Sequence, residues 1–163
     1  KTRTWLYPGS VTMLGADSVF DGIDYMQREI VFDNTGQLRK CSFLLDPDYT
    51  TINPALKIKN WGDCPVKVFL DGRRLSRGDD FYSACQGGSA IVWIKGRFNS
   101  PAAFEIIGGP DGDFNNDCDV DFADVKDFAG HWLTDNTNAN LDGHGIVDFS
   151  DYAALGENWL YGK

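Results

Sequence analysis

Oxygen-bearing side chains recur at a regular spacing in the C-terminal third of the chain. In residues 113–124 they occupy the first, third, fifth, ninth and twelfth places. Calcium takes six to eight oxygen ligands, and a twelve-residue loop of this spacing wraps the ion, with the seventh place giving a backbone carbonyl. The predicted ligands are Asp113, Asn115, Asp117, the Asp119 carbonyl, Asp121 and Asp124.

A second copy of this pattern begins 27 residues later, at residues 140–151. Its predicted ligands are Asn140, Asp142, the Ile146 carbonyl, Asp148 and Asp151. His144 stands at the fifth place, where its nitrogen suits a hard cation poorly, so the second site should be the weaker one. The repetition favours two calcium ions over the alternative of a solvated acidic face.

Each loop is followed by apolar residues at steps of three and four, which is the periodicity of one helix face. The two series are Phe122, Val125, Phe128, Ala129 and Trp132, and Phe149, Tyr152, Leu155, Gly156 and Trp159. We therefore expect two loop–helix units whose apolar faces bury one another.

Charge is distributed unevenly along the chain. Residues 1–108 carry 13 Lys and Arg against 12 Asp and Glu, a net of +1, whereas residues 109–163 carry 2 against 12, a net of −10. Self-repulsion of this size disfavours compaction unless cations neutralise it. Because there is no basic stripe, a nucleic-acid partner is not expected.

The first 108 residues have the pattern of a β protein. Short runs of branched and aromatic residues alternate with turn signals, as in antiparallel sandwiches. The expected strands are 29–32, 40–45, 56–58, 66–70, 91–94 and 104–107, and Asp71-Gly72 should close a hairpin after the fourth. A turn-rich Gly108–Gly112 ends this regime. The expected fold is an all-β antiparallel sandwich (1–108) followed by a small α domain of two calcium-loop–helix repeats (109–163).

The motifs "VDFADVKDFAGHWL" and "VDFSDYAALGENWL" within residues 111–161 resemble the dockerin family. The resemblance implies two calcium ions, two roughly antiparallel helices, and docking onto a cohesin module or capping of a larger enzyme. Cys118 stands at the sixth place, where calcium loops have Gly. Cohesin-binding members usually carry small hydroxylated residues at the tenth and eleventh places. Phe122-Ala123 and Phe149-Ser150 stand there instead, which makes intramolecular capping a serious alternative.

The first domain shows no catalytic motif. It contains no histidine, which excludes Ser-His and Cys-His nucleophile systems, and no local pattern supports a carboxylate pair. The chain is therefore expected not to be an enzyme. Residues 54–107 weakly resemble an accessory β-sandwich of bacterial polysaccharide-active enzymes.

Carbohydrate binding remains an alternative for the first domain, because sugar C–H faces stack on exposed aromatic rings. The aromatic candidates are Trp5, Tyr7, Trp61, Tyr82 and Trp93, of which Trp93 is expected in the core. The proposed ligand-binding set is Trp61, Tyr82, Arg73 and Arg74; the two arginines could equally form a solvated charged edge.

Four widely spaced cysteines are compatible with two disulfides in an oxidising compartment, the alternative being buried free thiols. We expect Cys64 to pair with Cys85, and Cys41 with Cys118. No run of apolar residues is long enough for a membrane span. The start at Lys1, directly before the strand-like Thr4–Tyr7, suggests a piece of a longer protein.

Together these features predict the non-catalytic C-terminal part of a secreted bacterial carbohydrate-active enzyme. Its partners would be a cohesin-like module, the parent enzyme's other domains, or a polysaccharide. The alternatives are a carbohydrate-binding module in its own right and a calcium-stabilised structural module of a cell-surface protein.

Overall fold

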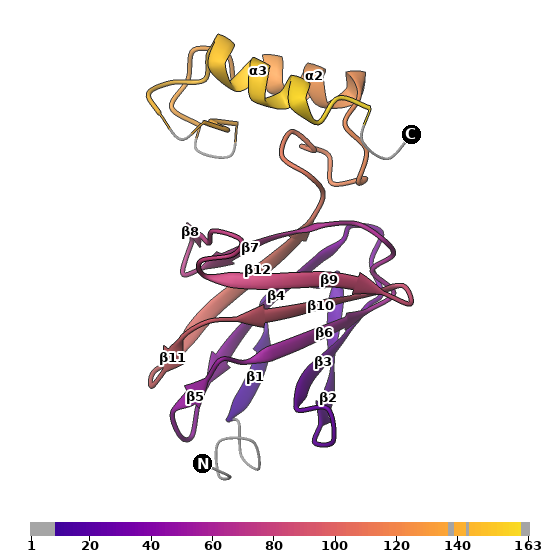
Figure 1. Ribbon diagram of the computed structural model, residues 1–163, viewed down its shortest axis with the longest axis vertical. Helices are drawn as coiled ribbons and strands as arrows, with labels where there is room; N and C mark the ends of the chain where they lie inside the picture. The colour runs from indigo at the N-terminus through magenta and orange to yellow at the C-terminus, as the bar shows by residue number, and fades with distance from the viewer. Residues whose placement is uncertain (1–8, 137–138, 143, 161–163) are drawn as a thin grey trace. The chain divides into compact units, whose positions relative to one another are not determined.

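The computed structural model describes residues 9–136, 139–142 and 144–160 (Figure 1). The chain divides into two compact units, residues 1–108 and 109–163, which are considered separately below. Trp5, Tyr7 and the strand-like segment around them lie outside the described residues. Within the described ranges, no helix has the length and apolar character needed to cross a membrane.

The first unit contains a five-stranded antiparallel sheet with the order β1-β4-β12-β7-β8. Its strands are β1 (Ser10–Met13), β4 (Lys40–Asp46), β7 (Val66–Leu70), β8 (Arg73–Arg74) and β12 (Ala102–Gly108). The predicted hairpin is confirmed, since β7 pairs with β8 across Asp71-Gly72. Both turn residues have positive φ, 49° and 78°, as the tight turns that suit twisted strands require.

A second five-stranded sheet has the order β2-β3-β6-β10-β9. Its strands are β2 (Ser18–Asp24), β3 (Glu29–Asn34), β6 (Ala55–Lys59), β9 (Phe81–Gln86) and β10 (Ser89–Ile94). The pair β3 and β6 is parallel, so the expectation of a purely antiparallel sandwich is wrong at this pair. A small ladder joins β5 (Thr51–Ile52) to β11 (Arg97–Phe98).

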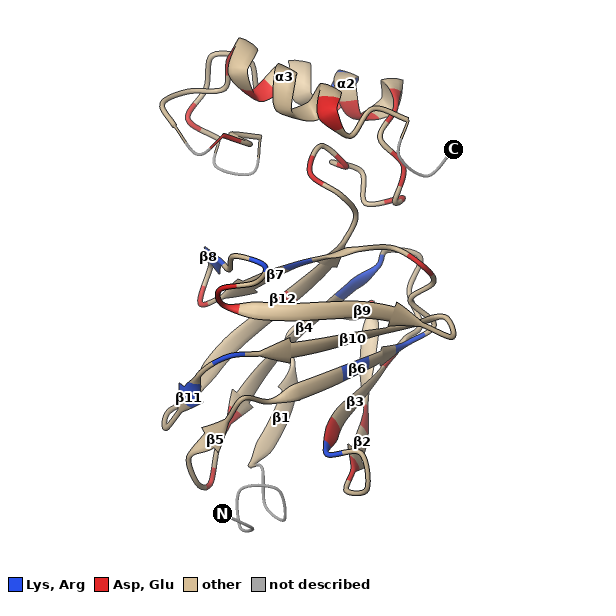
Figure 2. Cartoon of the chain, in the orientation of Figure 1, with Lys and Arg blue, Asp and Glu red and all other residues tan. Residues whose placement is uncertain are grey.

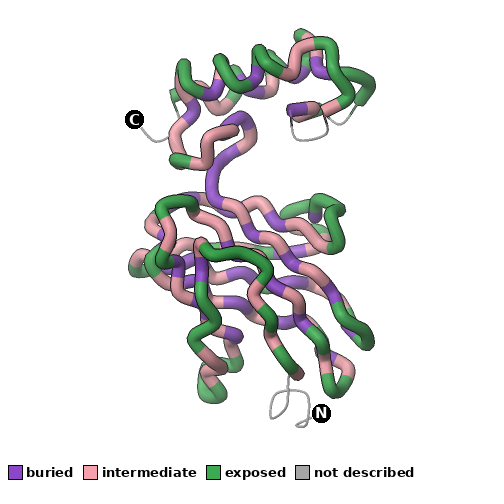
Figure 3. Tube along the Cα trace, turned by 180° about the vertical axis from the view of Figure 1, so that it is seen from behind, coloured by how far each residue is buried: buried purple, intermediate pink, exposed green. Residues whose placement is uncertain are grey.

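The core of this unit lies between the two sheets. Successive side chains of a strand point to opposite faces, and the burial of β3, β4 and β12 alternates accordingly. The Phe32 ring of β3 meets Phe43 of β4 at 4.5 Å between centroids, and Phe43 stacks on Phe104 of β12 at 5.3 Å. The sheets thus pack face to face, and Figure 3 shows the alternation along their strands.

The second unit contains the helices α2 (Phe122–Ala129) and α3 (Phe149–Glu157). Its core consists of Val120, Phe128, Ala139, Val147 and Leu155. The predicted apolar faces are therefore only partly buried: Phe122 and Phe149 are 80% and 78% exposed. Each lies at the first position of its helix, where the Phe122 ring contacts Trp159 and the Phe149 ring contacts Trp132.

Candidate functional site

The first acidic loop is organised around Asp124, whose side chain is fully buried. Its Oδ1 accepts hydrogen bonds from the amides of Phe114 (2.8 Å) and Asn115 (3.3 Å), and its Oδ2 from that of Asp121 (2.9 Å). Asp121 is the N-cap of α2 and accepts from Ala123, which completes a capping box. The start of the helix thus fixes the end of the loop.

The side-chain oxygens at the first, third and fifth places of this loop also accept hydrogen bonds from backbone amides of the loop. Asp113, 2% exposed, accepts from the amides of Asp117 (3.2 Å) and Cys118 (2.9 Å). Asn115 Oδ1 accepts from the Asp117 amide at 2.9 Å, and Asp117 Oδ1 from the Asp119 amide at 2.9 Å. The predicted side-chain ligands of the first loop therefore belong to one connected network.

The second loop repeats the arrangement around Asp151, which is also fully buried. Its Oδ1 accepts from Leu141 (2.6 Å) and Asp142 (3.0 Å), and its Oδ2 from Asp148 (2.9 Å), the N-cap of α3. Burial raises the pKa of Asp151, but the backbone amide hydrogen bonds outweigh it and hold the pKa below its usual value. The carboxylate is therefore kept ionised.

Asn140, the first-place residue of the second loop, carries a buried oxygen that is not satisfied. Its Nδ2 donates to Gly145 O at 3.0 Å, but its Oδ1 has no hydrogen-bond partner among the described residues. An unpaired buried acceptor costs about 1–3 kcal/mol. A cation ligated at this place would remove the penalty. His144, by contrast, directs Nδ1 to Asp142 O at 2.8 Å.

The oxygen-rich donor set of both loops suits calcium, which prefers carboxylate, amide and carbonyl oxygens. In the described part of the chain, however, no three Asp, Glu, His or Cys side chains form a group that could hold a metal ion. The carboxylates face backbone amides instead. The residue types fit a calcium ion, and ligation would require amide oxygens and backbone carbonyls beside the carboxylates.

The backbone of the two loops is duplicated as well. The sixth place has a left-handed conformation in both, with φ 74° at Cys118 and 69° at Gly145. In addition, Leu160 N donates to Val120 O and Leu133 N to Val147 O, both at 2.9 Å. The end of each repeat is thereby bonded to the loop of the other.

An apolar hollow of about 380 Å³ lies on the helix pair. It is lined by Val125, Phe128, Ala129, Trp132, Phe149 and Tyr152. The Trp132 and Phe149 rings meet edge to face at 5.0 Å, so the two helices form this surface jointly. Figure 2 shows that most charged residues of the unit are acidic.

The cysteines differ from the prediction. Cys64 and Cys118 are disulfide-bonded, whereas Cys41 and Cys85 are free thiols. Both predicted pairings, Cys64 with Cys85 and Cys41 with Cys118, are wrong, because each includes a free thiol. Cys41 lies in the core strand β4, and the Cys85 thiol donates to Cys64 O at 2.9 Å.

Two of the aromatic expectations for the first unit are also wrong. Trp61 was a candidate exposed ring, yet it is fully buried and donates Nε1–H to Cys64 O at 3.2 Å. Trp93, expected in the core, is 43% exposed and lies beside Tyr82, which is 48% exposed. Sequence reasoning thus missed one exposed ring. The signal that could have found it is the period of two in a strand, which puts Trp93 on the face opposite Val92 and Ile94.

The predicted arginine pair forms β8, and both residues are exposed. Arg73 lies 3.6 Å from Asp80, an exposed ion pair of little energetic weight. Because Trp61 is buried, the proposed set of Trp61, Tyr82, Arg73 and Arg74 does not form one surface.

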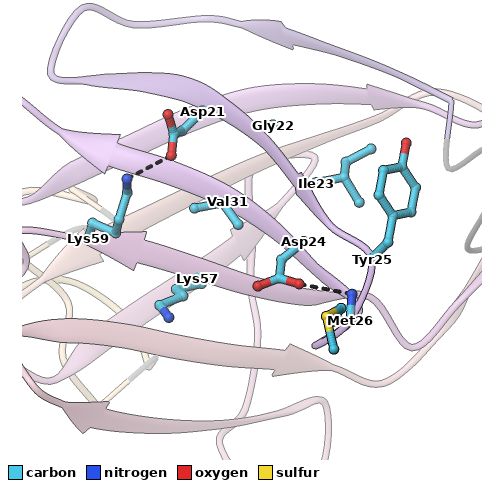
Figure 4. Close-up of a pocket in the computed structure, with 9 residues that line it drawn as sticks. All are labelled: Asp21, Gly22, Ile23, Asp24, Tyr25, Met26, Val31, Lys57 and Lys59. Carbon is cyan, nitrogen blue, oxygen red and sulfur yellow. Dashed lines mark hydrogen bonds and ion pairs between the residues drawn. The ribbon is translucent and has the colours of Figure 1, made fainter.

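A groove of about 540 Å³ runs along β2, β3 and β6 (Figure 4). It is lined by Asp21, Gly22, Ile23, Asp24, Tyr25, Met26, Val31, Lys57 and Lys59. Lys59 forms an ion pair with Asp21 at 2.7 Å, and Asp24 accepts from the Met26 amide at 2.9 Å.

Comparison of the chain with protein-family models, curated proteins and solved structures finds no match.

Proposed function

We propose that this chain is the non-catalytic C-terminal part of a secreted carbohydrate-active enzyme. In this proposal residues 109–163 are a dockerin-like module that binds two calcium ions, and residues 1–108 are an accessory β-sandwich. The module serves to dock a cohesin-like partner or to cap the parent enzyme.

The observation that carries the proposal is the equivalence of Asp124 and Asp151. Both are fully buried at the twelfth place, and both accept the amides of the second, third and ninth places of their own loop. Burying a charge is costly unless it is hydrogen-bonded and paired with an opposite charge or a metal, and the backbone amides supply the hydrogen bonds but no positive charge. Two such carboxylates in a segment of net charge −10 favour divalent cations as partners.

The first ion would be held by Asp113, Asn115, Asp117, the Asp119 carbonyl, Asp121 and Asp124, and the second by Asn140, Asp142, the Ile146 carbonyl, Asp148 and Asp151. Bound calcium supplies charge neutralisation and a cross-link within each loop, not a catalytic step. The unsatisfied Asn140 Oδ1 supports ligation at the second loop, where an uncharged first ligand and His144 lower the affinity.

The apolar hollow on α2 and α3 supports a docking role. Water-exposed apolar surface of this kind, rimmed by polar residues, marks interaction sites. Phe122 and Phe149 stand at the tenth place of their loops, where cohesin-binding dockerins usually have hydroxylated residues. Capping by another domain of the parent enzyme therefore remains the second form of the same proposal.

The proposal is tested by calorimetric titration of metal-stripped protein with calcium. We expect uptake of two ions, loss of the tighter site in Asp117→Ala, and loss of the weaker site in Asp142→Ala. Asp127→Ala is the matched control, because this exposed acid of α2 lies outside both loops. Absence of calcium uptake, or equal effects of all three substitutions, would contradict the proposal.

A further inference from the structure

The outer face of the β2-β3-β6-β10-β9 sheet carries an exposed aromatic pair. In the register of the sheet, Trp93 of β10 lies opposite Tyr82 of β9 on one side and Ala55 of β6 on the other. Ala55 in turn lies opposite Glu29 of β3. Across the sheet, this row thus consists of two aromatic rings, the small side chain of Ala55 and the carboxylate of Glu29.

The two rings are held in place by the protein. They are 6.0 Å apart between centroids and tilted by only 22°, so they lie nearly parallel. Trp93 Nε1–H donates to Asn53 O at 3.1 Å, and Lys95 Nζ lies 4.5 Å from the Tyr82 centroid. Because the indole N–H is already satisfied, the exposed part of the indole is apolar. These contacts also fix the ring, so little side-chain freedom is lost when a ligand covers it.

Polar groups lie beside the rings on the same face. Lys57 pairs in register with Ile91 and Val31, one step along the strands from Trp93, and lines the groove of Figure 4. Among the described residues, its side chain makes no hydrogen bond or ion pair, whereas its backbone belongs to the two strand pairs. Glu29 Oε2 is buried and likewise has no hydrogen-bond partner there. Neighbouring strands are about 4.8 Å apart, so the row from β9 to β2 spans about 19 Å.

We propose that this face binds a neutral polysaccharide chain. The C–H faces of consecutive pyranose rings stack on Tyr82 and Trp93, and their hydroxyls hydrogen-bond to the polar groups beside them, as in aromatic-lined ligand sites with a few placed polar groups. The inference names a substrate class for the accessory sandwich of the proposed function.

Charge favours a neutral chain over an acidic one. The face carries the carboxylates of Asp21, Asp24, Glu29 and Asp33 against the ammonium groups of Lys57, Lys59 and Lys95. Lys59 is already paired with Asp21. A surface without an excess of positive charge does not attract a polyanion, so acidic polysaccharides and nucleic acids are disfavoured.

The test is affinity electrophoresis of the full chain in gels containing single polysaccharides. The neutral panel is hydroxyethyl cellulose, xyloglucan, galactomannan and arabinoxylan, and the acidic panel is alginate and polygalacturonate. We expect retardation by at least one neutral polysaccharide, and affinity weaker by about tenfold in Trp93→Ala and in Tyr82→Ala, the size of effect expected for an aromatic anchor.

Two further variants separate stacking from folding. Trp93→Phe keeps a ring at the position and should retain most of the binding. Tyr49→Ala removes a tyrosine that is as exposed as Tyr82, 48% in each case, but lies between β4 and β5, outside this sheet, and should bind as wild type does. Thermal unfolding of every variant shows whether it is folded.

The inference is overturned if no neutral polysaccharide retards the wild type, if only the acidic panel does so, or if the ring substitutions act no more than Tyr49→Ala. Repeating the gels with a calcium chelator distinguishes this inference from the calcium proposal. Binding should persist with chelator, since the face belongs to the first unit. If the protein took up no calcium, the calcium proposal would fail and the inference of polysaccharide binding would be unaffected.

Discussion

The two free thiols lie in different surroundings. Cys41 is fully buried in β4, and this burial raises the pKa of its thiol to about 12 although the hydrogen bond with Ser18 lowers it. Burial and the Asp63 carboxylate also raise the pKa of Cys85, while Arg77 lowers it. The thiolate is the reactive form, so both cysteines should be poor nucleophiles in the folded protein.

We predict that a thiol reagent at pH 8 labels Cys85 slowly and does not label Cys41 until the protein unfolds. Because the folded state raises the Cys41 pKa above 9.0, the neutral thiol contributes stability below that pH, and this contribution is lost as the pH rises toward 12. Mass spectrometry of labelled peptides measures the rates. Equal labelling of the two thiols in the native protein, or labelling of Cys64 and Cys118 without reductant, would show the assignment to be wrong.

Two tryptophans show how far single residues can be placed from sequence. The run Ile91–Ile94 is apolar throughout, which favoured burial of Trp93, yet the strand buries Ala90, Val92 and Ile94 and turns Trp93 outward. Trp61 follows a strand within a turn, which favoured exposure. Its Nε1–H donates to Cys64 O only three residues on, but its burial depends on the packing of the sandwich, which local sequence does not carry.

The first turn of each helix shares its capping residues with the acidic loop before it. Asp148 caps α3 by accepting from the Ser150 amide at 2.8 Å, and Asp151 accepts in return from the Asp148 amide. Asp148 is also the ninth-place residue of the proposed calcium loop. Capping and ligation can therefore be separated by substitution.

We predict that Asp148→Ala lowers the free energy of unfolding of the second unit by about 0.5–2 kcal/mol, the usual value of an N-cap, when measured with chelator present. Asp148→Ser should retain most of that free energy, because serine also caps, but should bind calcium more weakly than wild type. Chemical denaturation followed by circular dichroism provides the stability, and calcium titration the affinity. If serine were as destabilising as alanine, the capping role would be refuted.

The elements themselves were largely predictable from local pattern. The six expected strands correspond to β3, β4, β6, β7, β10 and β12, and both expected helices are present. The parallel pairing of β3 with β6 was not predictable, because pairing between distant strands depends on topology and not on the alternation within either strand. The strands β1, β2 and β9 were not among the expected ones, and β5 and β11 have two residues each, too few for a periodic signal.

At the scale of the whole molecule, charge separates the two units. The first is nearly neutral and has an aromatic core, whereas the second carries ten net negative charges and a core of five buried hydrophobic residues. A segment of this size buries little apolar surface, so repulsion between its carboxylates weighs heavily. Two calcium ions would cancel four of the ten charges.

The site was predictable to the extent that its residues are close in sequence. Loop spacing indicated which residues gather around Asp124 and Asp151, because every hydrogen-bond partner of the two carboxylates lies within ten residues. The backbone amides as their partners were not predicted, and calcium binding stays a prediction. The state of the cysteines was not predictable, since four cysteines allow three connectivities and the sequence does not say which of them remain free thiols.

The central claim, that calcium holds the second unit together, is tested most directly by differential scanning calorimetry of the full chain with calcium and with chelator. At free calcium of about 100 times the dissociation constant, each site contributes about 2.7 kcal/mol to the stability of the folded unit. We predict that chelation shifts the unfolding of residues 109–163 to markedly lower temperature while the transition of residues 1–108 is unchanged. A thermogram that does not respond to chelator would contradict the claim.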